Sequence, residues 1–121
     1  MRWLLHGELT AAVADALRRH GHRTHTPTEA EMDAHEPGEI LEAAQRLQLD
    51  IITTDAALAA APFEQSVRFD RSIVFLQLEG GDVEQDDAVE RLFQRYQRLK
   101  PGRLYTVTAS RVKVRQLPVV K

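Results

Sequence analysis

The chain has 121 residues and no cysteine, with 43% hydrophobic residues, 28% charged residues and a formal net charge of −2. This length suits a single domain, residues 1–121, and the composition is that of a folded globular protein, which excludes a largely disordered chain. The lack of cysteine excludes disulfides and thiolate metal sites, no apolar run approaches the ~20 residues that span a bilayer, and the net charge excludes a global attraction to nucleic acid.

Strands and helices are predicted to alternate in the first half of the chain. Apolar residues at helical spacing predict the helices, and short apolar runs predict the buried strands. Gly21 follows the first helix, where a left-handed residue is often needed. The predicted elements are a strand at 2–5, a helix at 9–20, a polar edge strand at 22–26, a helix that residues 37–39 lead into and that carries apolar residues from Ile40 to Leu47, and a strand at 50–54.

The second half continues the alternation and ends differently. Its predicted elements are a short helix at about 56–61 ended by Pro62, a strand at 72–78, a helix that opens at Gly80 and is ended by Pro101, and two strands within 103–117 joined by a turn near Ala109. Strands that alternate with helices favour parallel pairing in a sheet covered on both faces. We therefore expect an α/β, three-layer α/β/α domain with a mainly parallel sheet of four to five strands and a C-terminal β hairpin.

Polar side chains collect after the predicted strands, where open α/β sheets bind ligands. They are His6 and Glu8, on either side of Gly7, after the first strand, Asp55 after the strand at 50–54, and Asp33, His35, Glu36 and Glu39 before the second helix. A cluster of carboxylates is what Mg²⁺ requires, and a bound ion with an activated water would support phosphodiester hydrolysis.

Each of these acids also has a structural explanation. Asp55 stands at a strand-to-helix junction, where it is a good N-cap, and cap preference alone favours that interpretation. Glu8 precedes the first helix and suits the positive end of its dipole. Glu36 and Glu39 flank the start of another helix in the same way.

Two groups of basic residues allow similar alternatives. His20, His22 and His25 lie close in sequence, but no metal-ligand spacing accompanies them, so we interpret them as solvated surface residues. Arg111, Lys113 and Arg115 alternate with valines, which places three cations on one face of a strand. This row is interpreted as either a phosphate-binding surface or protection of an edge strand against aggregation.

The chain resembles the small PIN-like proteins over nearly its whole length. The segments that carry the resemblance are, in order, "MRWLLHGELTAAVADALRRHGH", "EPGEILEAA", "DIITTDAALA" and "SIVFLQL". These proteins are similar to the toxin ribonucleases of bacterial toxin–antitoxin pairs. The resemblance implies a PIN-like fold, RNA cleavage with Mg²⁺ or Mn²⁺, and RNA, an antitoxin, another protein or a second copy as partner.

The acidic motif of the family is only partly present. Family members carry acids after the first strand, before the second helix and at the end of the strand that precedes the short helix. Asp55 matches the third acid, and Leu9 matches a family leucine. His6 stands where the first acid is expected, Pro37 where the second usually sits, and Ala57 where many members have a further aspartate.

Neighbouring acids must therefore complete the site if it is active. The resemblance then implies Asp55, Glu8 and Glu39 as catalytic residues and Asp55, Glu8 and Glu36 as metal ligands, with His6 at the edge of the site. A histidine at a Mg²⁺ site replaces a hard oxygen ligand by a nitrogen donor that suits transition metals better.

Three alternatives stay open from the sequence. In one, the chain is an inactive PIN-like module that binds RNA or a protein. In another, His6 and Asp55 pair without a metal, and the carboxylate raises the pKa of the imidazole. The chain is alternatively an unrelated small α/β regulator. With no signal-peptide pattern in the first ten residues, we expect a cytoplasmic protein that does not bind membranes.

Overall fold

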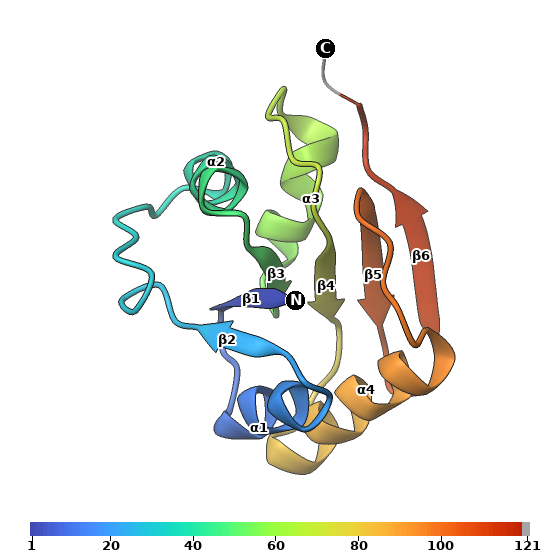
Figure 1. The fold of residues 1–121 in the computed structure, drawn as a ribbon. Coiled ribbons are helices and arrows are strands. Elements are labelled where there is room, and N and C mark those ends of the chain that lie inside the picture. Colours follow the sequence, from blue (N-terminus) through green and yellow to red (C-terminus); the bar gives the residue numbers. More distant parts are fainter. Residues whose placement is uncertain (120–121) are drawn as a thin grey trace.

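The fold is described from a computed structural model, which covers residues 1–119 of the chain. Strands and helices alternate as far as the last hairpin (Figure 1). The elements are β1 Arg2–His6, α1 Ala11–Arg19, β2 Arg23–His25, α2 Pro37–Leu47, β3 Asp50–Thr53, α3 Ala56–Glu64, β4 Ile73–Leu76, α4 Asp82–Arg95, β5 Arg103–Val107 and β6 Val112–Gln116. Within residues 1–119, no helix combines the length and apolar character needed to cross a membrane.

The strands form one sheet in the order β2-β1-β3-β4-β5-β6. All neighbours are parallel except β5 and β6, which form the antiparallel C-terminal hairpin. Helices α1 and α4 lie on one side of the sheet, and α2 and α3 lie on the other (Figure 1). The predicted three-layer α/β/α fold is thus confirmed, but the sheet has six strands where four to five were expected, because β2 and both hairpin strands join the same sheet.

Each face of the sheet has its own apolar core. Adjacent strand residues point to opposite faces, so Ile52 and Val74 pack with α1 and α4, whereas Ile51 and Ile73 pack with α2 and α3. All four side chains are fully buried. At about 1.5–3 kcal/mol for each fully buried large aliphatic side chain, these two layers hold the strand ends in fixed positions.

Helix α3 is longer than predicted, because Pro62 lies inside it and does not end it. Proline removes its own N–H, and in the last turn this costs only one helical hydrogen bond. The helix continues to Glu64, and Gln65 N–H still donates to the carbonyl oxygen of Ala61 at 2.8 Å. Pro62 is buried, and Phe63 packs against the same core.

Helix α4 is shorter than predicted, and β4 is also shorter than the strand expected at 72–78. The helix ends at Arg95, and Tyr96 is extended and packs edge-on against Tyr105 with ring centroids 5.5 Å apart. Leu99, predicted to be on the helix, is buried in the following segment, and the next residue donates its N–H to the Tyr105 hydroxyl at 2.8 Å. Core contacts beyond the helix therefore end it before Pro101.

Candidate functional site at the carboxyl ends of β1 and β3

The chain places β2 on one side of β1 and β3 on the other, so the order of the strands in the sheet reverses between β1 and β3. The carboxyl ends of these two parallel strands lie side by side. His6 at the end of β1 is in register with Thr53 at the end of β3. Ligands of open α/β sheets bind at such a reversal, outside the carboxyl ends of the strands. The fold thus places His6, Glu8 and Asp55 at the edge where the sequence predicts chemistry.

Two threonines tie the ends of β1 and β3 together. Thr53 Oγ1 lies 2.8 Å from Nδ1 of His6 and accepts the backbone N–H of Asp55 at 2.9 Å. Thr54 Oγ1 accepts the backbone N–H of Glu8 at 2.8 Å. We call these contacts the threonine clip. They use side chains from "IITT" whose role was not predicted from the sequence, although two polar residues at the end of a buried strand were a signal.

Gly7 allows the chain to turn tightly inside this clip. Its φ is +86°, a conformation that side chains other than glycine rarely adopt. A Cβ atom at this position would lie 2.5 Å from Thr54 Oγ1. Position 7 therefore requires glycine for both its backbone angle and its close approach to β3.

Gln85 of α4 is a second residue whose role was not predicted from the sequence. Its side chain is buried, and its Oε1 accepts the N–H of Thr10 at 2.9 Å while its Nε2 donates to the carbonyl oxygen of Glu8 at 3.2 Å. Gln85 falls on the same helical period as Val89 and Leu92, so a polar residue at a core position was the available signal. It fixes the segment between β1 and α1.

Asp55 is the N-cap of α3. Its Oδ1 accepts the N–H of Ala57 at 2.8 Å, the contact expected of a capping carboxylate. Partial burial lowers the pKa of His6, and the nearby Asp55 carboxylate opposes this shift without reversing it. Asp55 thus acts on the imidazole pKa in the predicted direction, but desolvation is the larger effect, and the hydrogen-bond partner of His6 is Thr53.

The remaining predicted acids lie at the start of α2. Glu39 Oε1 accepts the backbone N–H of Glu36 at 3.2 Å, which is one half of a capping box. Glu39 also lines a hollow of about 180 Å³ beside Asp33 and Arg46, whereas Glu8 lines a different cavity. Within residues 1–119, no three His, Asp or Glu side chains lie close enough together to hold a metal ion.

The cavity next to Glu8 has a volume of about 370 Å³ and opens at the carboxyl ends of the strands. Its lining is Glu8, Thr54, Ala56, Phe75, Leu76, Gln77, Leu78, Gly80 and Gln85. The lining contains one carboxylate and no positively charged side chain. The cavity offers hydrogen bonds to a polar ligand, but nothing in this lining would neutralise a phosphate.

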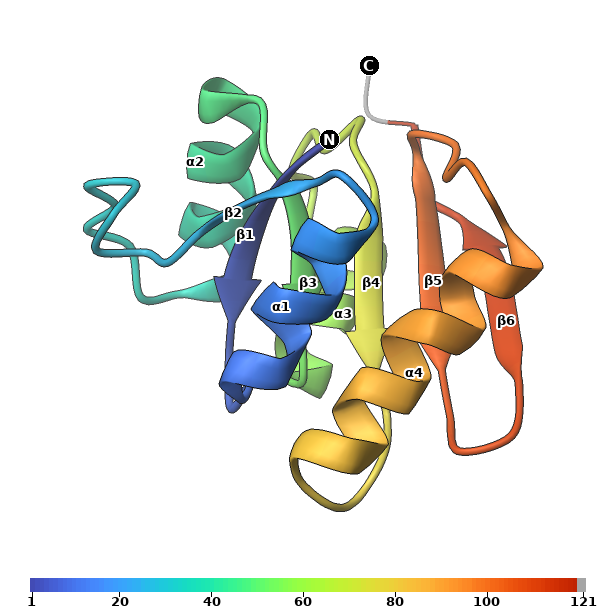
Figure 2. The same ribbon diagram turned by 60° about the horizontal axis from the view of Figure 1, so that its bottom comes forward.

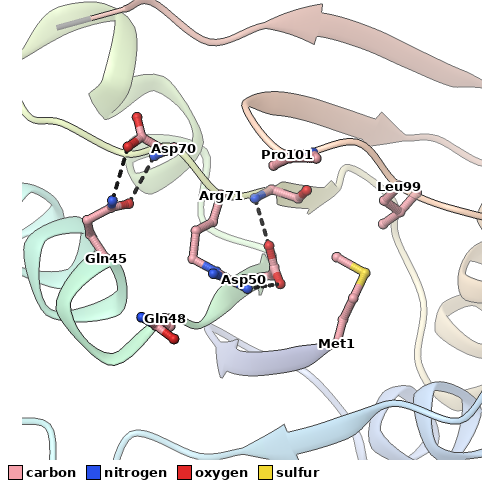
Figure 3. Close-up of a pocket in the computed structure, with 9 residues that line it drawn as sticks. Met1, Gln45, Gln48, Asp50, Asp70, Arg71, Leu99 and Pro101 are labelled. Carbon is pink, nitrogen blue, oxygen red and sulfur yellow. Dashed lines mark hydrogen bonds and ion pairs between the residues drawn. The ribbon is translucent and has the colours of Figure 1, made fainter.

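A larger cavity of about 450 Å³ lies at the opposite, amino-terminal edge of the sheet (Figure 3). There the buried carboxylate of Asp50 accepts the N–H of Ser72 at 2.8 Å and pairs with Arg71 at 3.1 Å. Gln45 and Asp70 are joined by two hydrogen bonds of 2.9 and 3.3 Å beside it. These contacts connect β3 and α2 to the segment before β4, so we assign them to folding.

The histidines after α1 form part of the packing. His22 Nδ1 accepts the indole N–H of the fully buried Trp3 at 3.2 Å. The rings of His20 and His22 lie 4.8 and 4.9 Å from the ring of Phe93, and His20 contacts the carboxylate of Glu90 at 3.1 Å. The interpretation of His22 as solvated is therefore wrong, because its ring is partly buried between Trp3 and Phe93. His20 is exposed, as interpreted, although it also contacts α4.

The basic residues of the tail lie away from the carboxyl-edge cavity, on β6 and the turn before it. Arg111, Lys113 and Arg115 are exposed, and the guanidinium of Arg115 lies 3.7 Å from the centre of the Phe63 ring. We call these three residues the basic row. Arg115 also lines a cavity of about 290 Å³ between α3 and strands β4 and β5.

The carboxyl edge therefore combines the threonine clip, one capping carboxylate and a polar cavity with a single acid. It places His6, Glu8 and Asp55 at one edge of the sheet, while Glu36 and Glu39 serve the start of α2. Comparison of the chain with protein-family models, with curated proteins and with solved structures finds no match.

Proposed function

We propose that this chain is a PIN-like module that acts by binding a partner, RNA or protein, rather than by metal-dependent cleavage of RNA. The observation that carries the proposal is the use of the candidate acids. Asp55 caps α3, Glu39 caps α2, and Glu8 alone lines the cavity at the carboxyl edge. Since Mg²⁺ and Mn²⁺ are held by several oxygen ligands, these separate roles favour binding without a metal.

Position 6 supports the same proposal. His6 stands where the resemblance expects the first acid, and it is half-buried and hydrogen-bonded to Thr53. A neutral imidazole in this contact supplies no negative charge for a hard cation. The order of strands and helices and the position of Asp55 after β3 support the PIN-like assignment.

A metal-dependent ribonuclease is the second candidate function. It is favoured by Glu8, whose carboxylate makes no hydrogen bond or ion pair within residues 1–119 although it lines a cavity at the strand-order reversal. Asp55 uses one carboxylate oxygen, Oδ1, as a cap. In this candidate, Mg²⁺ or Mn²⁺ would bind Glu8 and Asp55, with Glu36 or Glu39 brought in by movement of α2.

Cleavage of RNA separates the two candidates. We would incubate the protein with RNA and Mn²⁺ or Mg²⁺ and compare it with Asp55→Ala, using Asp87→Ala on the exposed side of α4 as a matched control. The proposal predicts no cleavage above background by any of the three proteins. Cleavage by the unaltered chain and by Asp87→Ala, lost in Asp55→Ala, would establish the ribonuclease instead.

A further inference from the structure

Strand β6 lies at the outer edge of the sheet (Figure 2), and no other strand within residues 1–119 pairs with its free side. Two hydrogen bonds fix which backbone groups are used: Thr108 N–H donates to Arg111 O, and Leu117 N–H donates to Gly102 O, both at 2.9 Å. Bonded and non-bonded pairs alternate in an antiparallel ladder. Counting from these bonds, Val112, Val114 and Gln116 direct their N–H and C=O groups away from β5.

The side chains beside these free groups differ between the two faces. Lys113 and Arg115 are in register with Thr106 and Leu104, on the side of α3. Val114 points to the other face and is 39% exposed. Successive cations on the same face of a strand are about 7 Å apart, which is also the spacing of alternate residues in any added strand.

The basic row carries positive charge without a counter-charge. None of its three residues lies within 4.0 Å of a carboxylate in the described part of the chain, and Arg115 is held against the Phe63 ring. Four other arginines, by contrast, are paired with carboxylates: Arg18, Arg19, Arg68 and Arg71. The edge thus combines free backbone groups with unneutralised and partly fixed cations.

We propose that the free edge of β6 binds an extended acidic segment of a partner protein by strand addition, which names the partner class for the binding role proposed above. The backbone of the segment pairs with Val112, Val114 and Gln116. Its carboxylates, at alternate positions, face Lys113 and Arg115. An apolar residue between them lies beside Val114 on the other face.

A second copy of the chain fits this edge poorly. The antiparallel two-fold pairing that uses all three outward-facing residues is centred on Val114. It places Lys113 directly opposite Arg115 of the second copy, twice, and like charges in opposite positions destabilise a pair of strands. The charge of the row therefore selects against self-association and for an acidic strand.

RNA also fits less well than an acidic strand. Binding of single-stranded RNA uses aromatic rings on which bases stack, and the nearest ring, Phe63, is covered by Arg115. RNA would also leave the N–H and C=O groups of β6 unused. If the cations only protect the edge strand against aggregation, no ligand is expected to bind there.

The test uses the whole chain and a labelled synthetic peptide in which glutamate alternates with threonine and valine, alongside a peptide with lysine in place of glutamate. Fluorescence anisotropy measures the affinity, and amide hydrogen exchange by NMR shows where the peptide lies. We expect binding of the acidic peptide only, with slower exchange of the amides of Val112, Val114 and Gln116.

Two variants test the two components of the site separately. Lys113→Glu with Arg115→Glu turns attraction into repulsion and is expected to weaken binding on the order of tenfold or more. Val114→Pro removes one outward N–H at an edge position, where proline is tolerated, and should weaken binding roughly fivefold or more. Arg98→Glu, an exposed arginine after α4, makes the same type of charge change elsewhere and should leave affinity unchanged.

Several results would overturn this inference. The inference fails if the acidic peptide does not bind, or if it slows amide exchange only outside β6. It also fails if an RNA oligonucleotide binds in a way that depends on the basic row but not on Val114. A dimer in sedimentation equilibrium that Val114→Pro dissociates would likewise contradict it. The proposed binding role fails on a different result, namely RNA cleavage that requires Asp55. Loss of one proposal is therefore distinguishable from loss of the other.

Discussion

Gly7 joins β1 to the segment before α1 with a φ of +86°, and a Cβ atom at this position would clash with the side chain of Thr54. We predict that Gly7→Ala lowers the free energy of unfolding by about 2 kcal/mol or more, since backbone strain of about 1–3 kcal/mol adds to a steric clash. Gly21→Ala is the matched control, because Gly21 has a φ of +83° with no atom near its missing Cβ. Urea denaturation measures both, and equal losses would show that the clip does not constrain position 7.

His22 is a residue at which pH acts on stability. Burial lowers the pKa of His22, with smaller contributions from the N-terminal ammonium group and His20, while Asp50 opposes the shift. The folded protein thus keeps His22 neutral at pH values where the unfolded chain, with a pKa of about 6.5, already binds the proton. The contribution of neutral His22 to the free energy of unfolding is complete above the unfolded-state pKa of about 6.5. It is lost as the pH falls from that value through the lower pKa of the folded state.

We predict that the chain is less stable at pH 5.5 than at pH 7.5, and that part of this difference disappears in His22→Gln. Protonation of Nδ1 in His22 removes the acceptor of the buried Trp3 N–H, which costs about 1–3 kcal/mol. Urea denaturation at the two pH values measures the effect. An unchanged pH dependence in the variant would exclude His22 as its source.

At the scale of the element, Asp55 tests whether the start of α3 is a cap or a metal site. Asn and Asp cap helices about equally well, so Asp55→Asn should change the free energy of unfolding by only a few tenths of a kcal/mol, whereas Asp55→Ala should cost about 1 kcal/mol. Thermal unfolding with and without Mn²⁺ measures both effects. Stabilisation of the unaltered chain by Mn²⁺, absent in Asp55→Asn, would contradict the account.

The order and type of the elements could be predicted from the sequence, because period and local turn signals determine them. The spacing from Leu9 to Leu17 indicated α1, and the apolar runs at 50–54 and 72–78 indicated β3 and β4. The ends of the helices were harder to predict where tertiary contacts determine them. Pro62 stays within α3, and the Tyr96–Tyr105 contact ends α4 before Leu99.

The candidate site could be predicted only in part for the same reason. Position after a strand was enough to place His6 and Asp55 at one edge. The roles of Thr53 and Gln85 depend on hydrogen bonds between residues that are far apart in the chain, up to 77 positions for Gln85 and Glu8. A local sequence pattern does not indicate which distant residue a side chain will contact. The sequence therefore predicted which residues lie at the carboxyl edge but not the hydrogen bonds between them.

At the scale of the whole molecule, the carboxyl edge and the edge of β6 carry charges of opposite sign. The carboxyl edge carries Glu8 and Asp55, and the start of α4 adds acids in its first turn, Asp82 and Glu84. The basic row lies on β6 and the turn before it. A net charge of −2 therefore conceals an acidic face that disfavours phosphate and a basic edge that favours carboxylates.

The most direct test of the central claim, binding without metal-dependent catalysis, is a calorimetric titration of the protein with Mn²⁺ at neutral pH. The account predicts only weak, non-stoichiometric heats that are the same for the unaltered chain, Glu8→Gln and Asp55→Ala. Stoichiometric binding of an ion, lost in Glu8→Gln and in Asp55→Ala, would show that these acids form a metal centre and would contradict the account.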